Sequence, residues 1–195
     1  IASEDTADSI FSKLHAANIL SLNETMELLD ENEISRAVDL ISSAERVFCF
    51  GQGGSMVMAM EAWARFSTAT SRFVHIEDSH MQVMSIALAS EKDVILFFSY
   101  SGSTKDMEDV MRIARKQRVS VILITHFPKS RATEFADVVL LCGYNESPLQ
   151  SGSVAAKVGQ LFLIECLFYI FCKRNLEVCA DARSATAEAI TQKLL

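Results

Sequence analysis

Short apolar runs alternate with helical segments along most of this chain, and this alternation restricts the fold more than any other feature. Five runs that are rich in β-branched and aromatic residues predict strands at 46–50, 72–76, 94–98, 119–125 and 138–141. The segments between and after them predict helices at 56–67, 79–88, 104–117, 129–135, 151–173 and 182–194. Strands that alternate with helices pair in parallel through right-handed crossovers. The sequence therefore predicts an α/β fold, a three-layer α/β/α sandwich with a five-stranded parallel sheet in flavodoxin-like strand order.

One domain accounts for the whole pattern, because 195 residues can bury one substantial core but not two. Residues 1–44 are predicted to form a helical lead-in, in which Asn23 would be an N-cap. Residues 45–175 are predicted to form the α/β core and residues 176–195 a C-terminal helix. Because the chain begins with Ile1 rather than methionine, we expect it to be a fragment or a processed product.

Charge and cysteine content exclude several kinds of protein. A net charge of -7 argues against this chain alone binding a nucleic-acid backbone, which needs a basic face. The five cysteines are an odd number without a C-x-x-C pair, which favours a reduced, cytoplasmic protein without a zinc site. The apolar stretch 161–172 is interrupted by Glu165 and is shorter than the about 20 residues that span a bilayer. We therefore expect a core or interface helix there and no membrane partner.

Two of the predicted strands end in loops that are rich in glycine and hydroxyl side chains. The loop after the first strand is GQGGS (51–55), the loop after the third is SYSGST (99–104), and each opens a helix. Backbone N–H groups at a helix start lack partners, glycine lets a ligand approach the backbone, and hydroxyls donate to anionic oxygens. The first and third strands are neighbours in a flavodoxin-like order, so the pair of loops predicts one phosphate site.

Other interpretations of these loops fit the residues less well. Each loop taken alone could be an ordinary strand-to-helix turn with a Ser or Thr cap. A dinucleotide fingerprint that begins at Gly51 would need a glycine where this chain has Met56, although Glu77 or Asp78 could serve as the ribose-binding acid. A P-loop would need G-K-S/T after a glycine-rich turn, and none follows.

Four segments, in this order, carry a resemblance to a known family: AERVFCFGQGGS, EKDVILFFSYSGST, VSVILITHFPKS and FADVVLLC. The first loop resembles the G-x-G-x-S loop of SIS (sugar isomerase) domains, and the second resembles their S-x-S-G-x-T phosphate loop. With the lead-in NETMELLDENEISRAVDLI, residues 18–171 resemble the sugar-phosphate-binding half of RpiR-type transcriptional regulators. The resemblance implies a phosphosugar ligand, no cofactor or metal, and a homodimer or higher homo-oligomer with pockets close to a subunit boundary.

The resemblance also implies roles for individual residues. Ser99, Ser101 and Thr104 would hold the phosphate, helped by backbone N–H groups around Gly102 and Ser103. Glu146, in the loop after the fifth strand, is similar in placement to an acid that faces the sugar in SIS isomerases. The complete predicted phosphosugar-binding set is Gln52, Gly53, Gly54, Ser55, Ser99, Ser101, Gly102, Ser103, Thr104 and Glu146.

Two main classes of function remain open, a sensor and an enzyme. A sugar-phosphate isomerase needs a positioned base and usually an acid, for which the candidates are Glu146 with His80 or Lys157. His80 is equally explained as a capping or surface residue, and Lys157 is better explained as a solvated surface charge. Glu146 could be a simple loop residue, although its place at the carboxyl end of a strand favours a role in the site. No spacing defines an acid–base pair, so no catalytic residue is predicted. His75 and His126 are predicted to be structural.

The preferred interpretation is therefore the effector-sensing and dimerisation module of an RpiR-type regulator, with a sugar-phosphate isomerase or standalone SIS enzyme as the alternative. A dimerisation module with a decayed pocket is a third possibility, and the intact hydroxyl loop argues against it. DNA would be contacted only through an N-terminal helix-turn-helix domain, because no basic recognition helix precedes the first strand of this chain.

Overall fold

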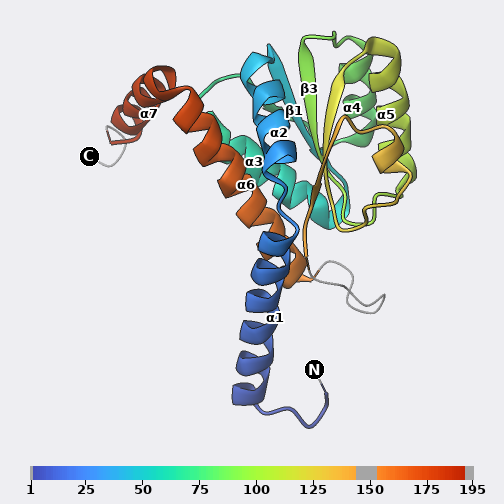
Figure 1. Ribbon diagram of the computed structural model, residues 1–195, viewed down its shortest axis with the longest axis vertical. Helices are drawn as coiled ribbons and strands as arrows, with labels where there is room; N and C mark the ends of the chain where they lie inside the picture. Colours follow the sequence, from blue (N-terminus) through green and yellow to red (C-terminus); the bar gives the residue numbers. More distant parts are fainter. Residues whose placement is uncertain (1, 144–152, 192–195) are drawn as a thin grey trace.

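A parallel sheet of five strands forms the centre of the protein in a computed structural model, which describes residues 2–143 and 153–191 (Figure 1). The strands are β1 (Arg46–Gly51), β2 (Phe73–His75), β3 (Asp93–Phe98), β4 (Ser120–Thr125) and β5 (Val138–Leu141). They lie in the order β2-β1-β3-β4-β5, and every neighbouring pair is parallel. The predicted sheet and its flavodoxin-like order are confirmed.

Helices cover both faces of the sheet (Figure 1). One face carries α2 (Glu31–Ser43), α3 (Met56–Ser67) and α6 (Val154–Arg174). The other face carries α4 (Ser79–Ala87) and α5 (Lys105–Gln117). Successive residues of a strand point to opposite faces. Val94 and Leu96 of β3 therefore belong to the hydrophobic cluster on the face of α2, α3 and α6, and Ile95 belongs to the cluster on the face of α4 and α5. The structure is the predicted three-layer α/β/α sandwich.

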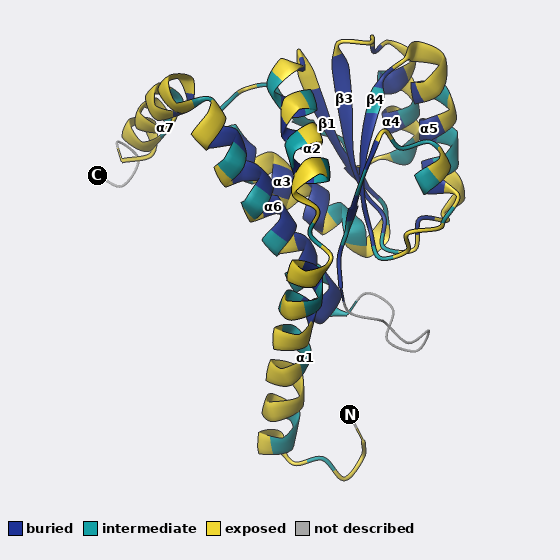
Figure 2. Cartoon of the chain, in the orientation of Figure 1, coloured by how far each residue is buried: buried dark blue, intermediate teal, exposed yellow. Residues whose placement is uncertain are grey.

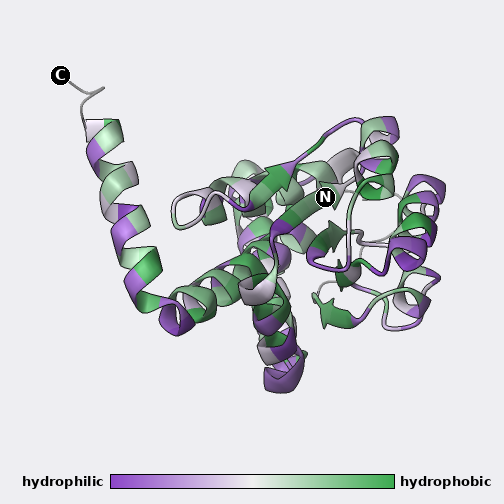
Figure 3. Cartoon of the chain, turned by 90° about the horizontal axis from the view of Figure 1, so that it is seen from above, coloured by the Kyte–Doolittle hydropathy of each residue, from purple (hydrophilic) through white to green (hydrophobic). Residues whose placement is uncertain are grey.

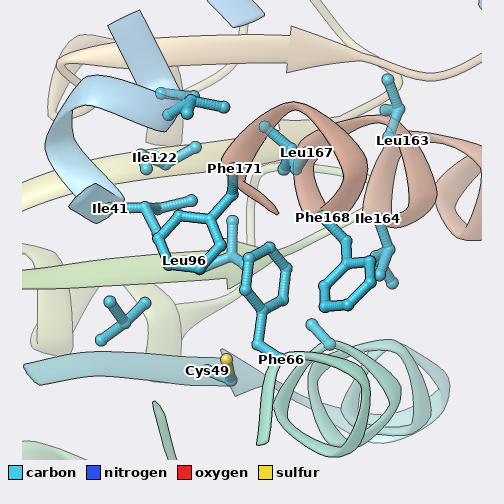
Figure 4. Close-up of a cluster of buried hydrophobic side chains, with 14 of the residues drawn as sticks. Ile41, Cys49, Phe66, Leu96, Ile122, Leu163, Ile164, Leu167, Phe168 and Phe171 are labelled. Atoms are coloured by element: carbon cyan, nitrogen blue, oxygen red, sulfur yellow. The ribbon is translucent and has the colours of Figure 1, made fainter. Parts of the chain in front are cut away.

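The larger hydrophobic cluster fills the space between the sheet and α2, α3 and α6 (Figure 4). Phe66 of α3 is fully buried there and stacks on Phe73 of β2, with 4.2 Å between the ring centroids. Phe168 of α6 meets the Phe66 ring edge-on, with 5.3 Å between the ring centroids. These contacts hold α3 and α6 in fixed positions on the sheet.

α6 is 21 residues long and apolar enough in composition to cross a membrane. Half of its most apolar 18-residue stretch is buried inside the protein. Leu163, Leu167 and Phe171 belong to the hydrophobic cluster on the sheet. The prediction of a core helix at 161–172 is confirmed. The helix is longer than the predicted stretch. Its apolar composition is explained by its contacts with the sheet.

Two predictions about local helices are wrong. α1 (Ala7–Glu27) is one uninterrupted helix whose N-cap is Thr6, so Asn23 lies inside a helix and does not cap one. The helix predicted at 129–135 is only a 3₁₀ turn at Ala132–Glu134. The Thr133 hydroxyl accepts from the Ser130 N–H at 3.1 Å and donates to the Ser130 carbonyl at 2.7 Å, so local side-chain bonds replace helical ones.

The C-terminal helix α7 (Leu176–Thr191) begins directly after Asn175, at the predicted boundary of the C-terminal segment 176–195 and before residue 182, where the residue pattern predicted the helix to start. The Asn175 side-chain amide donates to the Phe171 carbonyl at 2.9 Å, at the end of α6, and the Asn175 carbonyl accepts from Cys179 of α7. One asparagine thus ends the first helix and starts the second.

α1 and α7 extend away from the sandwich and are largely exposed (Figure 2). A view from above shows hydrophobic residues concentrated on the strands, whereas the helix that leads to the C-terminus mixes hydrophobic and hydrophilic residues along its length (Figure 3). Within the described part of α7, Cys179 is the one buried residue. Neither helix is therefore held by a large apolar contact with the body.

Candidate functional site

A cavity of about 340 Å³ opens where the carboxyl ends of β1 and β3 lie side by side. Strand order reverses at this point of the sheet, which is the usual ligand position in open α/β folds. The lining comes from the loop after β1, the loop after β3 and the first turns of α6. The described lining residues are Gln52, Gly54, Ser55, Phe98, Ser99, Tyr100, Ser101, Thr104, Ser153, Ala156, Lys157 and Gln160.

Three helices begin at this cavity. Ser55 is the N-cap residue of α3, Thr104 that of α5 and Ser153 that of α6, and all three line the cavity. Within the described residues, the hydroxyls of Ser55 and Thr104 make no capping hydrogen bond to their own helices. The positive ends of three helix dipoles therefore converge on one space, and two of the three N-cap hydroxyls are not used to cap their own helices.

The loop after β3 is a tight turn around Gly102. The Gly102 N–H donates to Ser99 Oγ at 3.2 Å, and Gly102 has a positive φ of 61°. A Cβ at this position would lie 2.7 Å from Ser130 Cβ, so only glycine fits without displacing the neighbouring loop. The turn leaves Ser101 and Thr104 on the lining of the cavity.

A chain of hydrogen bonds joins the two loops. Thr104 Oγ1 donates to Gln52 Oε1 at 3.3 Å, and Gln52 Nε2 donates to Gln82 Oε1 at 3.1 Å. Gln82 is fully buried on α4 and its amide donates to the Ile76 carbonyl at 2.7 Å. Gln52 is thereby held in one orientation at the edge of the cavity.

Lys157 supplies a positive charge to the cavity from the second turn of α6. A Cβ on Gly54 would lie 3.6 Å from Lys157 Nζ, so the ammonium group lies against the glycine-rich loop. No carboxylate or imidazole is among the described lining residues. The cavity therefore has the electrostatic character of an anion site.

The model of the SIS domain family matches residues 40–170. The chain belongs to the SIS domain family. The resemblance that the loops GQGGS and SYSGST suggested is thus confirmed over the segment that contains both of them.

Curated relatives of this SIS domain include transcriptional regulators. An HTH-type transcriptional regulator of Haemophilus influenzae is 28% identical over 193 residues, which are 99% of this chain and 67% of that protein. The HTH-type transcriptional regulator RpiR of Escherichia coli K12 is 26% identical over 177 residues, which are 91% of this chain and 60% of that protein. The chain thus spans 60–67% of the length of these two relatives.

Solved structures share the fold of this SIS domain. The Vibrio vulnificus NanR protein, complexed with ManNAc-6P, superposes with a TM-score of 0.89 at 27% identity, covering 94% of this chain and 70% of that one. The phosphoheptose isomerase GmhA of Neisseria gonorrhoeae superposes with a TM-score of 0.74 at 16% identity, covering 86% and 100%. The second likeness shows the fold alone.

The structure brings six of the predicted binding residues to the lining of one cavity: Gln52, Gly54, Ser55, Ser99, Ser101 and Thr104. Gly53, Gly102 and Ser103 shape the two loops without lining the cavity. Glu146 lies outside the described residues. His80 is exposed on α4 and is not among the described lining residues, so it is not placed as the acid–base partner that an isomerase would need.

The first turns of α6 contribute side chains to this SIS site that the sequence did not predict. Lys157 is half-buried and lines the cavity, so it is not a fully solvated surface charge. Gln160, buried on the same helix, was not considered. Ser153, Lys157 and Gln160 are spaced at i, i+4 and i+7, so the sequence places them on one helix face but does not show that this face meets the cavity.

Tyr100 was also missed, and its position depends on His126. The two rings stack with centroids 5.1 Å apart, and His126 Nδ1 lies 2.9 Å from the Cys142 carbonyl. His75 Nδ1 lies 3.1 Å from the Cys49 carbonyl. Both histidines that were predicted to be structural contact the backbone of neighbouring strands or strand ends.

Proposed function

We propose that this SIS domain binds a sugar phosphate and acts as the effector-sensing and dimerisation module of an RpiR-type transcriptional regulator. The observation that carries the proposal is the convergence of three helix starts, a hydroxyl-rich turn and Lys157 on one cavity. A phosphate group accepts hydrogen bonds from backbone N–H groups and hydroxyls at such a place. Relatives among HTH-type regulators, and the NanR structure with ManNAc-6P, support the same proposal.

In this proposal, Ser99, Ser101 and Thr104 hold the phosphate with backbone N–H groups near Gly102 and Ser103. Lys157 balances part of the phosphate charge. Contacts to the sugar come from Gln52, Gly53, Gly54, Ser55, Tyr100 and Gln160, and, on sequence grounds alone, from Glu146. Residues 1–195 act as one domain, and DNA is contacted by a helix-turn-helix domain outside this sequence. A cytoplasmic location goes with that role.

We propose binding without turnover. The described lining of the cavity supplies hydroxyls, amides, one ammonium group and one phenol, which suit a phosphosugar, and it includes no carboxylate or imidazole; Glu146, the candidate base, lies outside the described residues. A ligand that regulates must bind two arrangements of the protein with different affinities. The site therefore needs no catalytic group to serve a regulator.

A ligand screen tests the proposal directly. The purified chain is heated with hexose, amino-sugar and pentose phosphates, ManNAc-6P among them, and with the unphosphorylated sugars as controls. We expect one phosphosugar to raise the melting temperature and to remain unchanged by NMR after incubation. Conversion to the ketose or aldose partner would instead identify an isomerase. No stabilisation by any phosphate would contradict the proposed function.

Ser101→Ala and Thr104→Ala are expected to weaken binding of that phosphosugar about 10- to 150-fold, because each loses a hydrogen bond to a charged group. Both hydroxyls line the cavity, so the fold should be retained. Isothermal titration calorimetry measures the effect. Ser120→Ala is the matched control, because Ser120 is the first residue of β4 and lies at the amino ends of the strands, away from the cavity. Unchanged affinity in both loop variants would contradict the phosphate assignment.

A further inference from the structure

Two hydroxyl side chains hold α1 on the sandwich. Among the 21 described residues of α1, Ser21 and Thr25 are the only buried ones. Ser21 Oγ donates to the Ala155 carbonyl at 2.6 Å. Thr25 Oγ1 donates to the Ser21 carbonyl at 2.6 Å and accepts from the Gly143 N–H at 2.9 Å. We call Ser21, Thr25, Gly143, Ala155 and Gly159 the α1 clasp.

The clasp brings the backbones of α1, α6 and the end of β5 unusually close together. A Cβ on Gly159 would lie 2.5 Å from Thr25 Oγ1 and 3.0 Å from Ser21 Oγ. A Cβ on Gly143 would lie 2.8 Å from the Thr25 nitrogen. Any larger side chain at either glycine would push α1 away. The contact is therefore specific to small residues on both sides.

The same two turns of α6 also form a wall of the cavity. Ala155 and Gly159 face α1, whereas Ser153, Ala156, Lys157 and Gln160 line the cavity. Gln160 is buried, and its amide lies 3.8 Å from the Sγ of Cys142, which directly precedes Gly143 of the clasp. A shift of this part of α6 would move Lys157 and Gln160 together with the partners of α1.

The buried part of the contact between α1 and the sandwich is small and polar. Its larger apolar side chains, such as Phe11 (65% exposed) and Leu14 (50% exposed), do not anchor it. Its buried contact instead consists mainly of a few hydrogen bonds, each of which contributes only about 1 kcal/mol net. Elements with few buried apolar contacts open at low free-energy cost. A helix of this length is about 30 Å long, so a small change at the clasp becomes a large displacement at its far end.

We propose that the docking of α1 and the occupancy of the cavity are coupled through the α1 clasp. Ser21 and Thr25 are then positioning residues of the phosphosugar site, although neither lines it. This inference rests on the proposed function. Coupling is reciprocal: a ligand that orders the start of α6 strengthens the docking of α1, and loosening α1 weakens ligand binding by the same factor.

The first test measures ligand affinity in clasp variants of the full chain by calorimetry. The probes are inorganic phosphate and the sugar phosphates of the screen above. Thr25→Val keeps the shape of the side chain but removes the acceptor for Gly143, and should weaken binding at least about fivefold. Thr25→Ser should restore most of the affinity. Ser12→Ala, on the exposed part of the same helix, should bind like the wild type.

The second test does not depend on a variant that folds. Hydrogen exchange of residues 7–27 in the wild-type chain should slow when the probe binds, because ligand and docked α1 stabilise each other. A probe that binds the wild type but leaves both α1 exchange and the Thr25→Val affinity unchanged would overturn the coupling and leave the proposed function intact. Failure of every probe to bind the wild type would overturn the proposed function, and the coupling with it.

Discussion

Phe66→Ala is expected to lower the free energy of unfolding by about 3–5 kcal/mol. The Phe66 side chain is 0% exposed and contacts three other rings, those of Phe73, Phe168 and Phe171, at centroid distances of 4.2, 5.3 and 5.5 Å. Removing it leaves a cavity between α3, β2 and α6 that a densely packed interior cannot fill. For a chain of this size the melting temperature should fall by about 6–20 °C.

Urea unfolding followed by circular dichroism measures this loss. Phe11→Ala is the matched control, because the same ring is 65% exposed on α1 and should change the free energy by no more than about 0.5 kcal/mol. Phe66→Leu retains part of the packing and should fall between the two. Equal losses in the Phe66→Ala and Phe11→Ala variants would contradict the central place of Phe66 in the core.

The sheet could be predicted from the sequence because its local and its global requirements agree. β3 is buried on both faces, and its residues Val94 to Phe98 are an uninterrupted apolar run, as a central parallel strand requires. The alternation of strands and helices predicted a parallel sheet, and the observed order β2-β1-β3-β4-β5 is the flavodoxin-like order expected for it. Residue burial and the sequence pattern indicated the same strands, so the prediction and the structure agree there.

The errors arose where one side chain decides a local structure. Asn23 is a good N-cap by residue type, yet α1 continues through it because the hydrogen bonds of Ser21 and Thr25 hold the surrounding turns against α6. Asn175 ends α6 with hydrogen bonds that residue type alone does not predict. At Asn23 tertiary contacts override a local preference, whereas at Asn175 a local side-chain bond ends the helix.

The site was predicted from its glycines and hydroxyls, but only in part. The loops GQGGS and SYSGST carry their own signal, because a helix start and a strand end adjoin them in sequence. Lys157 and Gln160 come from a helix that follows the fifth strand, and only the fold brings that helix to the same edge of the sheet. Gln82, whose bond orients Gln52, was invisible for the same reason.

Gly102→Ala should weaken phosphosugar binding by about 150-fold or more, because a displaced turn loses at least two hydrogen bonds to the phosphate. Alanine is strained at the φ of 61°, and its Cβ would lie 2.7 Å from Ser130 Cβ. The loop that carries Ser101 and Thr104 must therefore move, or the loop at Ser130 must. The core elements are not involved, so urea unfolding should show a loss of only about 1–2 kcal/mol.

Gly53→Ala separates strain from collision. Gly53 has a similar φ of 55°, but a Cβ there meets no atom of the described chain within 4 Å. Gly53→Ala should therefore weaken phosphosugar binding less than Gly102→Ala in the same calorimetric titration. Adding Ser130→Gly to Gly102→Ala removes the colliding side chain and should restore part of the binding. If the two alanine variants bind equally, or the second change restores nothing, then contact with Ser130 does not set the geometry of the phosphate turn.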